Sequence, residues 1–340
     1  MPAAELRRAV AEDRLALLPV ERALSGEGER HTVAEVAARS GLERPFLDRL
    51  WRSLGMAVPG DDERALSDED VAAARRVAAL REAGVPEEGI LEVSRLLGMT
   101  MSQLAAANRR LIADAFLREG DNEYDVAVRF ADAARSFTPL IGEALTHTLN
   151  LHLREQIRHD AFGAAELSAG RPAAAEEVTV AFADVVGFTR LGETLDPDQL
   201  GAVTGRLGEL AAEVVAPPVR LVKLIGDAAM LVGPEPKPVL DAALGLVGAT
   251  QVEDFPILRA GVASGEALPR AGDWYGRPVN LASRITAIAR PGSVLATEPV
   301  RDRLEDEYRW SFAGSRRLKG IEGQVKLHRC RPADSGDENG

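Results

Sequence analysis

Hydrophobic and polar positions follow different periods in the two halves of this chain. Up to about residue 165, apolar side chains recur at helical spacing among Ala, Leu, Arg and Glu, which predicts an all-α region. From about 176 to 332, short apolar runs alternate with helical stretches, which predicts a mixed region of strands and helices. The Gly-, Pro- and Ala-rich segment 168–177 between them has the composition of a linker.

The second half predicts a particular order of elements. We expect strands at 178–183, 219–225, 228–232, 257–264, 293–297, 309–313 and 324–330, and helices at 197–213, 238–250 and 278–289. The first six elements run strand–helix–strand–strand–helix–strand, which is the ferredoxin-like split βαβ arrangement. The fold class predicted for the whole chain is therefore α+β, with an all-α region in front of a βαββαβ domain.

The first half contains a helix-turn-helix pattern. A short helix is expected from about His31 to a Gly turn at Gly41, and the next helix from Pro45 to Leu54. Ser67 then has the character of an N-cap before a long helix. Residues 31–100 carry nine Arg against thirteen Asp and Glu and no Lys, and this net charge of −4 makes DNA an unfavourable partner.

Bulk properties narrow the class of protein further. A net charge of −12 over 340 residues argues against a nonspecific nucleic-acid binder. The chain has a single cysteine, so no internal disulfide can form, which fits a cytoplasmic location. Its charged N-terminus lacks the apolar core of a secretion signal, and no apolar stretch is long enough to predict a membrane span.

Two aspartates follow apolar runs in the second half and suggest a metal site. Asp184 ends a β-branched strand, and Asp227 follows a Gly turn after the next strand, 43 residues later. Hard cations such as Mg²⁺ take oxygen ligands from carboxylates and substrate phosphates. Two such cations can hold the attacking and leaving oxygens of a phosphoryl-type displacement. Either aspartate alone would more often be a turn or capping residue.

A second group of polar residues suits a nucleotide. Lys223 and Asp273 can donate to and accept from an adenine edge. Asn280 and Arg284 are four residues apart on one expected helix and can orient a ribose and neutralise phosphate charge. Taken singly, each of these residues would more often be a solvated surface residue. Two further cations, Arg259 and Lys319, flank strand-like runs.

These motifs, in this order, resemble the catalytic domain of the class III nucleotidyl cyclases, specifically the adenylyl cyclases, over residues 176–331. The resemblance implies that Asp184, Asp227 and the backbone carbonyl of Val185 bind two divalent cations, Mg²⁺ or Mn²⁺. It implies the roles of the other residues as follows: adenine selection by Lys223 and Asp273, transition-state stabilisation by Asn280 and Arg284, and phosphate binding by Arg259 and Lys319.

The resemblance also implies a reaction and an assembly. ATP would be converted to 3′,5′-cyclic AMP and pyrophosphate at a site formed between two catalytic domains. One domain would supply the aspartates and Arg259, and the other the remaining residues. Because one chain carries both sets, a head-to-tail homodimer with two equivalent sites is expected.

The first half resembles a MerR-like winged helix over residues 31–100, and the whole chain resembles the mycobacterial-type, pH-sensing adenylyl cyclases. The domains expected are a helical regulatory domain at 1–140, a linker helix and linker at 141–175, the catalytic domain at 176–331, and a disordered tail at 332–340. The regulatory domain is expected to be autoinhibitory. Candidate proton switches are three histidines in the region before the catalytic domain: His147, His152 and His159.

Other functions remain as alternatives at this stage. One is a nucleotide-responsive DNA-binding regulator that uses the cyclase fold as a sensor. A guanylyl cyclase is disfavoured by Lys223 and Asp273, and a diguanylate cyclase by the absence of a Gly-Gly-Asp/Glu-Glu-Phe motif.

Overall fold

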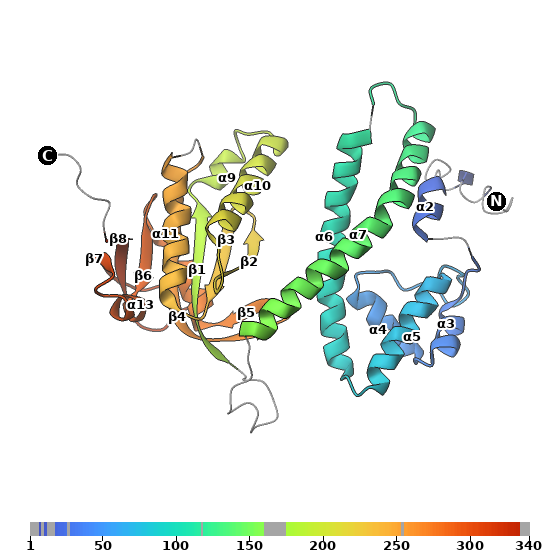
Figure 1. The fold of residues 1–340 in the computed structure, drawn as a ribbon, viewed down its shortest axis with the longest axis horizontal. Coiled ribbons are helices and arrows are strands. Elements are labelled where there is room, and N and C mark those ends of the chain that lie inside the picture. Colours follow the sequence, from blue (N-terminus) through green and yellow to red (C-terminus); the bar gives the residue numbers. More distant parts are fainter. Residues whose placement is uncertain are drawn as a thin grey trace. The chain divides into compact units, whose positions relative to one another are not determined.

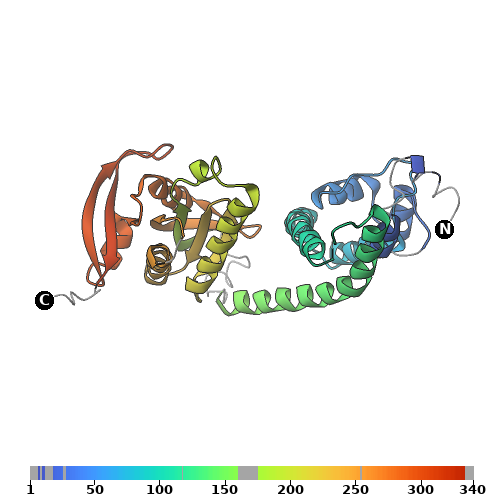
Figure 2. The same cartoon turned by 90° about the horizontal axis from the view of Figure 1, so that it is seen from above.

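The chain folds into two compact units, Met1–Asp160 and Ala161–Gly340 (Figure 1). The computed structural model describes residues 7, 10–11, 18–25, 28–116, 118–159, 175–252 and 255–333. Among these residues the first unit is helical and the second combines a sheet with helices (Figures 1 and 2), which confirms the predicted α+β class.

The helices of the first unit follow the expected helix-turn-helix order. They are α2 (Leu18–Ser25), α3 (Val33–Ser40), α4 (Arg44–Ser53), α5 (Asp68–Glu82), α6 (Glu87–Phe116) and α7 (Glu123–His159). Thr32 and Ser67 form capping boxes at the starts of α3 and α5, so side chains satisfy the otherwise unpaired N–H groups there. Gly41 ends α3 with a φ of 76°, a conformation that favours glycine. A core that includes Val33, Leu47 and Val71 joins these helices.

The helix α7 is a single element of 37 residues with Pro139 inside it. The border expected between the regulatory domain and the linker helix, at residue 140, falls within this helix and stays a prediction. The expected linker continues into residues 160–174, which lie outside the described residues, as do residues 334–340 of the expected tail.

The second unit is built on an eight-stranded sheet. Its elements are β1 (Glu176–Val185), α9 (Phe188–Leu191), α10 (Pro197–Val214), β2 (Arg220–Ile225), β3 (Ala228–Gly233), α11 (Pro236–Val252), β4 (Leu258–Arg270), β5 (Asp273–Gly276), α12 (Arg277–Ile288), β6 (Val294–Thr297), α13 (Glu298–Arg303), β7 (Tyr308–Arg316) and β8 (Val325–Pro332). The strand order is β2-β3-β1-β4-β6-β8-β7, and β5 pairs with β4. The first four strands, with α10 and α11 between them in sequence, form the predicted ferredoxin-like core.

Two hydrophobic layers cover the two faces of this sheet. One contains Leu207 of α10 and Leu246 of α11, together with the strand residues Ala181 and Ala183. The other contains Ile285 of α12, with strand residues of the opposite parity. Three short elements, β5, α9 and α13, were not predicted, because none of them carries an apolar run or a helical repeat that would mark it. No helix in the described ranges has both the length and the apolar character needed to cross a membrane.

Candidate active site

Asp184 and Asp227 lie together at one edge of the sheet. Asp184 is the next-to-last residue of β1 and stands opposite Ala228 of β3 and Arg259 of β4. Gly226, with a φ of 60°, makes the tight turn that places Asp227 between β2 and β3. The N–H of Val185 donates to the Asp227 carbonyl at 3.0 Å, which fixes the turn against β1.

The carboxyl group of Asp227 is affected by burial and by the neighbouring Asp184. Burial raises the pKa of Asp227, and the hydrogen bond and charge of the neighbouring Asp184 raise it further. Arg259 acts in the opposite direction and forms an ion pair with Asp184, with 2.7 Å between Nη2 and Oδ2. Two carboxyl groups are therefore held close together, and Arg259 is the cationic side chain among the described residues that offsets their charge.

This donor set suits hard divalent cations. Carboxylate oxygens are preferred ligands of Mg²⁺, which usually takes one or two of them and completes its shell with water and substrate phosphates. No group of three or more His, Cys, Asp or Glu side chains that could hold a metal occurs among the described residues. A cation at the two aspartates would therefore need further oxygen ligands, and the Val185 carbonyl as one of them stays a prediction.

Arg259 is held by two elements at once. Besides its contact with Asp184, its Nη1 donates to the carbonyl of Ala287 near the end of α12, at 2.8 Å. This carbonyl was not anticipated from the sequence, because backbone acceptors leave no trace in residue identity. The guanidinium is thereby fixed beside the aspartates, where it is able to meet an anion.

Lys223 and Asp273 form an ion pair between β2 and β5. The second carboxylate oxygen of Asp273 accepts from the N–H of Trp274 at 2.8 Å, which orients the group. Trp274 is buried in the layer under α12, whereas Tyr275 is exposed. The structure thus brings together the two residues expected to select adenine.

Asn280 and Arg284 share the exposed side of α12, and neither has a hydrogen-bond or ion-pair partner within the described ranges. The helix itself is precisely seated, because a Cβ on Gly261 of β4 would stand 2.5 Å from the N of Thr286. The Thr286 hydroxyl also donates to the carbonyl of Phe182 in β1, at 3.1 Å. A glycine inside a strand is a sequence signal for such a close approach.

Lys319 lies in the loop between β7 and β8 and is exposed. No contact in the described part of the chain joins it to the aspartates or to the Lys223–Asp273 pair. Five predicted residues therefore fall into two contacting groups, Asp184–Asp227–Arg259 and Lys223–Asp273, while Asn280, Arg284 and Lys319 stand apart from both.

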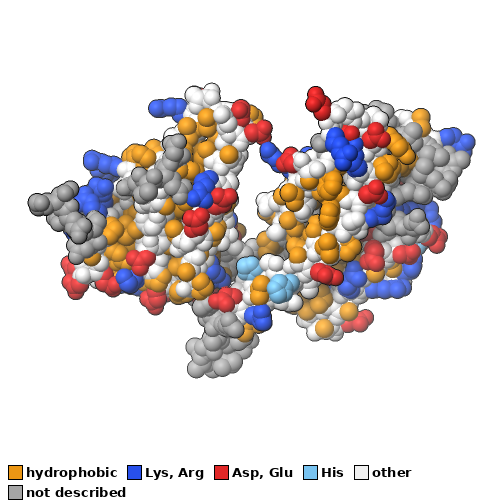
Figure 3. Space-filling view, turned by 45° about the horizontal axis from the view of Figure 1, so that its top comes forward, with side chains coloured by type: hydrophobic (Ala, Val, Ile, Leu, Met, Phe, Trp, Pro, Cys, Tyr) orange, Lys and Arg blue, Asp and Glu red, His pale blue; other side chains and the backbone are white. Residues whose placement is uncertain are grey.

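The candidate histidines belong to α7. His147 and His152 are exposed, and histidine side chains are visible at the surface in Figure 3. His159 is the last residue of α7, and its side chain lies outside what the structure describes. Their role in pH sensing stays a prediction.

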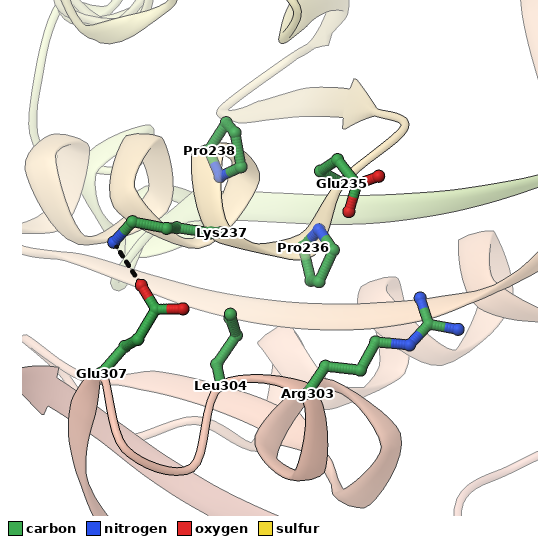
Figure 4. Close-up of a pocket in the computed structure, with 7 residues that line it drawn as sticks. All are labelled: Glu235, Pro236, Lys237, Pro238, Arg303, Leu304 and Glu307. Atoms are coloured by element: carbon green, nitrogen blue, oxygen red, sulfur yellow. Dashed lines mark ion pairs between the residues drawn. The ribbon is translucent and has the colours of Figure 1, made fainter.

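An open pocket of about 520 Å³ lies elsewhere on the second unit, where α11 begins and α13 ends (Figure 4). None of the predicted site residues lines it. Two of its cationic groups are already paired, Lys237 with Glu307 at 2.9 Å and Arg303 with Glu177 at 2.8 Å. The pocket is therefore separate from the candidate active site.

Comparisons with known proteins match the two halves of the chain to two different families. Residues 1–157 match the family described as the adenylate cyclase regulatory domain, and residues 171–330 match the adenylate and guanylate cyclase catalytic domain. The chain is 41% identical to the pH-sensitive adenylate cyclase MT1302 of Mycobacterium tuberculosis, over 93% of this chain and 81% of that protein.

Two further similarities are less close. An adenylate cyclase of Streptomyces griseus is 32% identical over 84% of this chain and 70% of that protein. Among solved structures, the guanylate cyclase domain of RhGC from Catenaria anguillulae, in complex with GTP, is 21% identical with a TM-score of 0.43, covering 48% of this chain and all of that one.

Proposed function

This chain belongs to the adenylate cyclases that carry a regulatory domain in front of a class III catalytic domain, and from that premise we propose that it makes cyclic AMP by two-metal catalysis at sites shared between two copies of the chain. The observation that carries this proposal is the Asp184–Asp227 pair at the edge of the sheet. The raised pKa of Asp227 supports it, because a divalent cation would offset the burial and the neighbouring charge of Asp184 that raise this pKa.

Asp184, Asp227 and the Val185 carbonyl would hold two divalent cations, Mg²⁺ or Mn²⁺. When bound, the cations would lower the pKa of the ribose 3′ hydroxyl and neutralise the triphosphate. Arg259 would leave its ion pair with Asp184 and contact a substrate phosphate while the Ala287 carbonyl keeps it in place. Its guanidinium can form two parallel hydrogen bonds to phosphate oxygens.

Lys223 and Asp273 would read the adenine base. The lysine ammonium donates to a ring nitrogen, and the carboxylate accepts from the exocyclic amine. Their ion pair brings both side chains to one place, where each would contact the edge of the same base.

Asn280 and Arg284 would act on the reacting groups, with the amide orienting the ribose and the guanidinium neutralising charge on the pentavalent phosphorus. Hydrogen-bond donors that already point toward the charge developing in the transition state need no reorganisation during the reaction. The seating of α12 against Gly261 and Phe182 supplies such rigidity. Lys319 would contact the phosphates from the β7–β8 loop.

A homodimer would complete each site. Leu224 and Ile225, just before the turn that carries Asp227, are 43% and 49% exposed, and Tyr275 beside Asp273 is 55% exposed. Apolar side chains at the rim of a polar site suit an interface with a second catalytic domain. We propose ATP as the substrate, and we do not propose DNA as a binding partner.

The first unit would regulate this assembly. The relative MT1302 is named pH-sensitive, and we extend that property to this chain, with higher activity in acid and inhibition by the first unit near neutral pH. His147, His152 and His159 on α7 are the proposed proton acceptors. Histidine is the side chain whose unperturbed pKa lies nearest to physiological pH.

The experiment that tests the proposal is cyclic nucleotide formation by the full-length chain from ATP and from GTP, with Mn²⁺, between about pH 5.5 and 8. Cyclic AMP from ATP alone, formed faster in acid, is the expected result. A double variant with His152→Ala and His159→Ala should show a flatter pH profile, and an unchanged profile removes the histidines from the proposal. The chain shortened to residues 171–340 should be active; an inactive fragment that is folded and dimeric contradicts autoinhibition.

A further inference from the structure

Arg329 of β8 has an unusual environment for a charged residue. Its side chain is half-buried, and its Nε is shielded from solvent with no hydrogen-bond partner. Val325 and Leu327, on the same face of β8, pack in the layer under α12. Because side chains alternate along a strand, Arg329 and Arg331 continue that face toward the edge of the sheet.

Other arginines surround it. Arg331 stands opposite Arg309 of β7, and Arg290 follows directly after Ala289, the C-cap residue of α12. Burial, and then the charges of Arg331 and Arg290, lower the pKa of Arg329. Arg290 and Arg331 are exposed, and within the described ranges no carboxylate pairs with the side chain of Arg290, Arg329 or Arg331.

Local features offset only part of this positive charge. Arg309 donates from Nε to the carbonyl of Ala333 at 3.2 Å. The end of α12 contributes roughly half a negative charge through its unpaired carbonyls, against three guanidinium groups. Arg290, Arg329 and Arg331 thus bring three guanidinium groups near one another in a chain whose net charge is −12. Lys and Arg side chains are visible along the β7–β8 end of the unit in Figure 3.

We propose that Arg290, Arg329 and Arg331 form a binding site for a phosphate-bearing anion, outside the active site. Guanidinium groups bind phosphate oxygens through parallel hydrogen bonds, and the unpartnered Nε of Arg329 supplies a donor at the base of the site. Because several guanidinium groups lie together with no acid between them, they suit an anion with several phosphate groups better than they suit a ligand with a single carboxylate.

The position of the site suggests where the anion comes from. Ala260 of β4 is in register with Val294 of β6, which is in register with Cys330 of β8. Arg331 is therefore about two strand spacings, roughly 10 Å, from Arg259 along the same edge of the sheet. Pyrophosphate released by the cyclase reaction is the nearest source, and this assignment rests on the proposed active site; orthophosphate from solution has the same chemistry.

The test is calorimetric titration of the full-length chain with inorganic pyrophosphate and with orthophosphate, in EDTA, so that no divalent cation supports binding at the aspartates. We expect pyrophosphate to bind and Arg331→Gln or Arg329→Gln to weaken it about tenfold, the effect of one charged hydrogen bond. Arg316→Gln, an exposed arginine at the other end of β7, is the matched control for net charge and should leave binding unchanged.

A second control separates this site from the active site. Lys319→Gln removes a proposed active-site phosphate ligand and should leave pyrophosphate binding in EDTA intact. Binding that is lost in Lys319→Gln and kept in Arg331→Gln would overturn the inference without affecting the proposed cyclase site. Equal weakening by Arg316→Gln and Arg331→Gln would overturn it as well. If Arg329→Gln does not fold, the exposed pair Arg290→Gln and Arg331→Gln carries the test, and equally tight orthophosphate binding would assign the site to single phosphate groups.

Discussion

The proposed division of the active site between two chains predicts that two inactive variants restore activity when they are combined. Asp184→Asn removes a carboxylate from one set, and Arg284→Ala removes a guanidinium from the other. Asn at position 184 still accepts a hydrogen bond from Arg259, and Arg284 is exposed, so both variants should fold. Each variant alone should lose activity by a factor of about a hundred or more, because Arg284→Ala removes a transition-state donor and Asp184→Asn removes a proposed metal ligand.

The magnitude of recovery follows from the symmetry of the dimer. In a mixed dimer one site receives both substitutions and the other receives none. Random pairing makes half of the dimers mixed, and each mixed dimer has one intact site of two, so about a quarter of wild-type activity should return. The assay is cyclic AMP formation by the two chains coexpressed with different affinity tags, before and after purification through both tags.

A matched pair of variants shows whether the sets are assigned correctly. Asp184→Asn and Asp227→Asn belong to the same set, so their mixed dimers contain no intact site and should stay inactive. Recovery in this control pair, or no recovery by Asp184→Asn with Arg284→Ala in purified mixed dimers, would refute the assignment of the two sets to different chains.

Three further predictions concern single elements of the second unit. Lys223→Ala with Asp273→Ala should remove the preference for ATP over GTP, measured as the ratio of kcat/KM values; an unchanged preference would place base selection elsewhere. Gly261→Ala puts a Cβ 2.5 Å from the N of Thr286, so it should lower the free energy of unfolding by roughly 1–3 kcal/mol in urea titrations and reduce kcat; wild-type stability would show that α12 yields easily. Burial raises the pKa of Cys330 to about 12, so the native thiol should resist iodoacetamide at about pH 8 and react once the chain is unfolded. Because unfolding returns this pKa to about 8.5, the thiol should also lower stability as the pH rises above that value, and Cys330→Ala should lessen this loss.

The sheet and its chemistry could be predicted from the sequence where local patterns carry them. The apolar and β-branched run at 178–183 leads to Asp184 near the end of β1, and a Gly turn precedes Asp227, so the sequence predicts both aspartates near strand ends. The ferredoxin-like order β2-β3-β1-β4 followed from the sequence of strands and helices.

Contacts between residues far apart in the chain could not be predicted from the sequence. The ion pair between Arg259 and Asp184 spans 75 residues, and the strand register that creates it depends on which face of β4 is buried. β5 was missed because Asp273–Gly276 is short, although it is the strand that brings Asp273 to Lys223. The seating of α12 depends on the missing side chain of Gly261, and its importance emerges only when the helix above it is known.

The proposed pH regulation requires that protonation of a histidine on α7 change what the end of this helix contacts. Near the C-terminal end of α7, four apolar side chains are 44% to 71% exposed: Leu149, Leu151, Leu153 and Ile157. His152 lies among them in the sequence. Protonation of an exposed histidine changes the stability of an isolated helix little, since water solvates the charge. The same protonation in a contact with apolar side chains is costly, because the charged imidazole must be desolvated. The pH response therefore requires that this part of α7 be covered in one state of the dimer and free in the other. Replacing Ile157 with Glu should then mimic acid, raising cyclic AMP formation near neutral pH, and an Ile157→Glu variant with the wild-type pH profile would contradict this account of the switch.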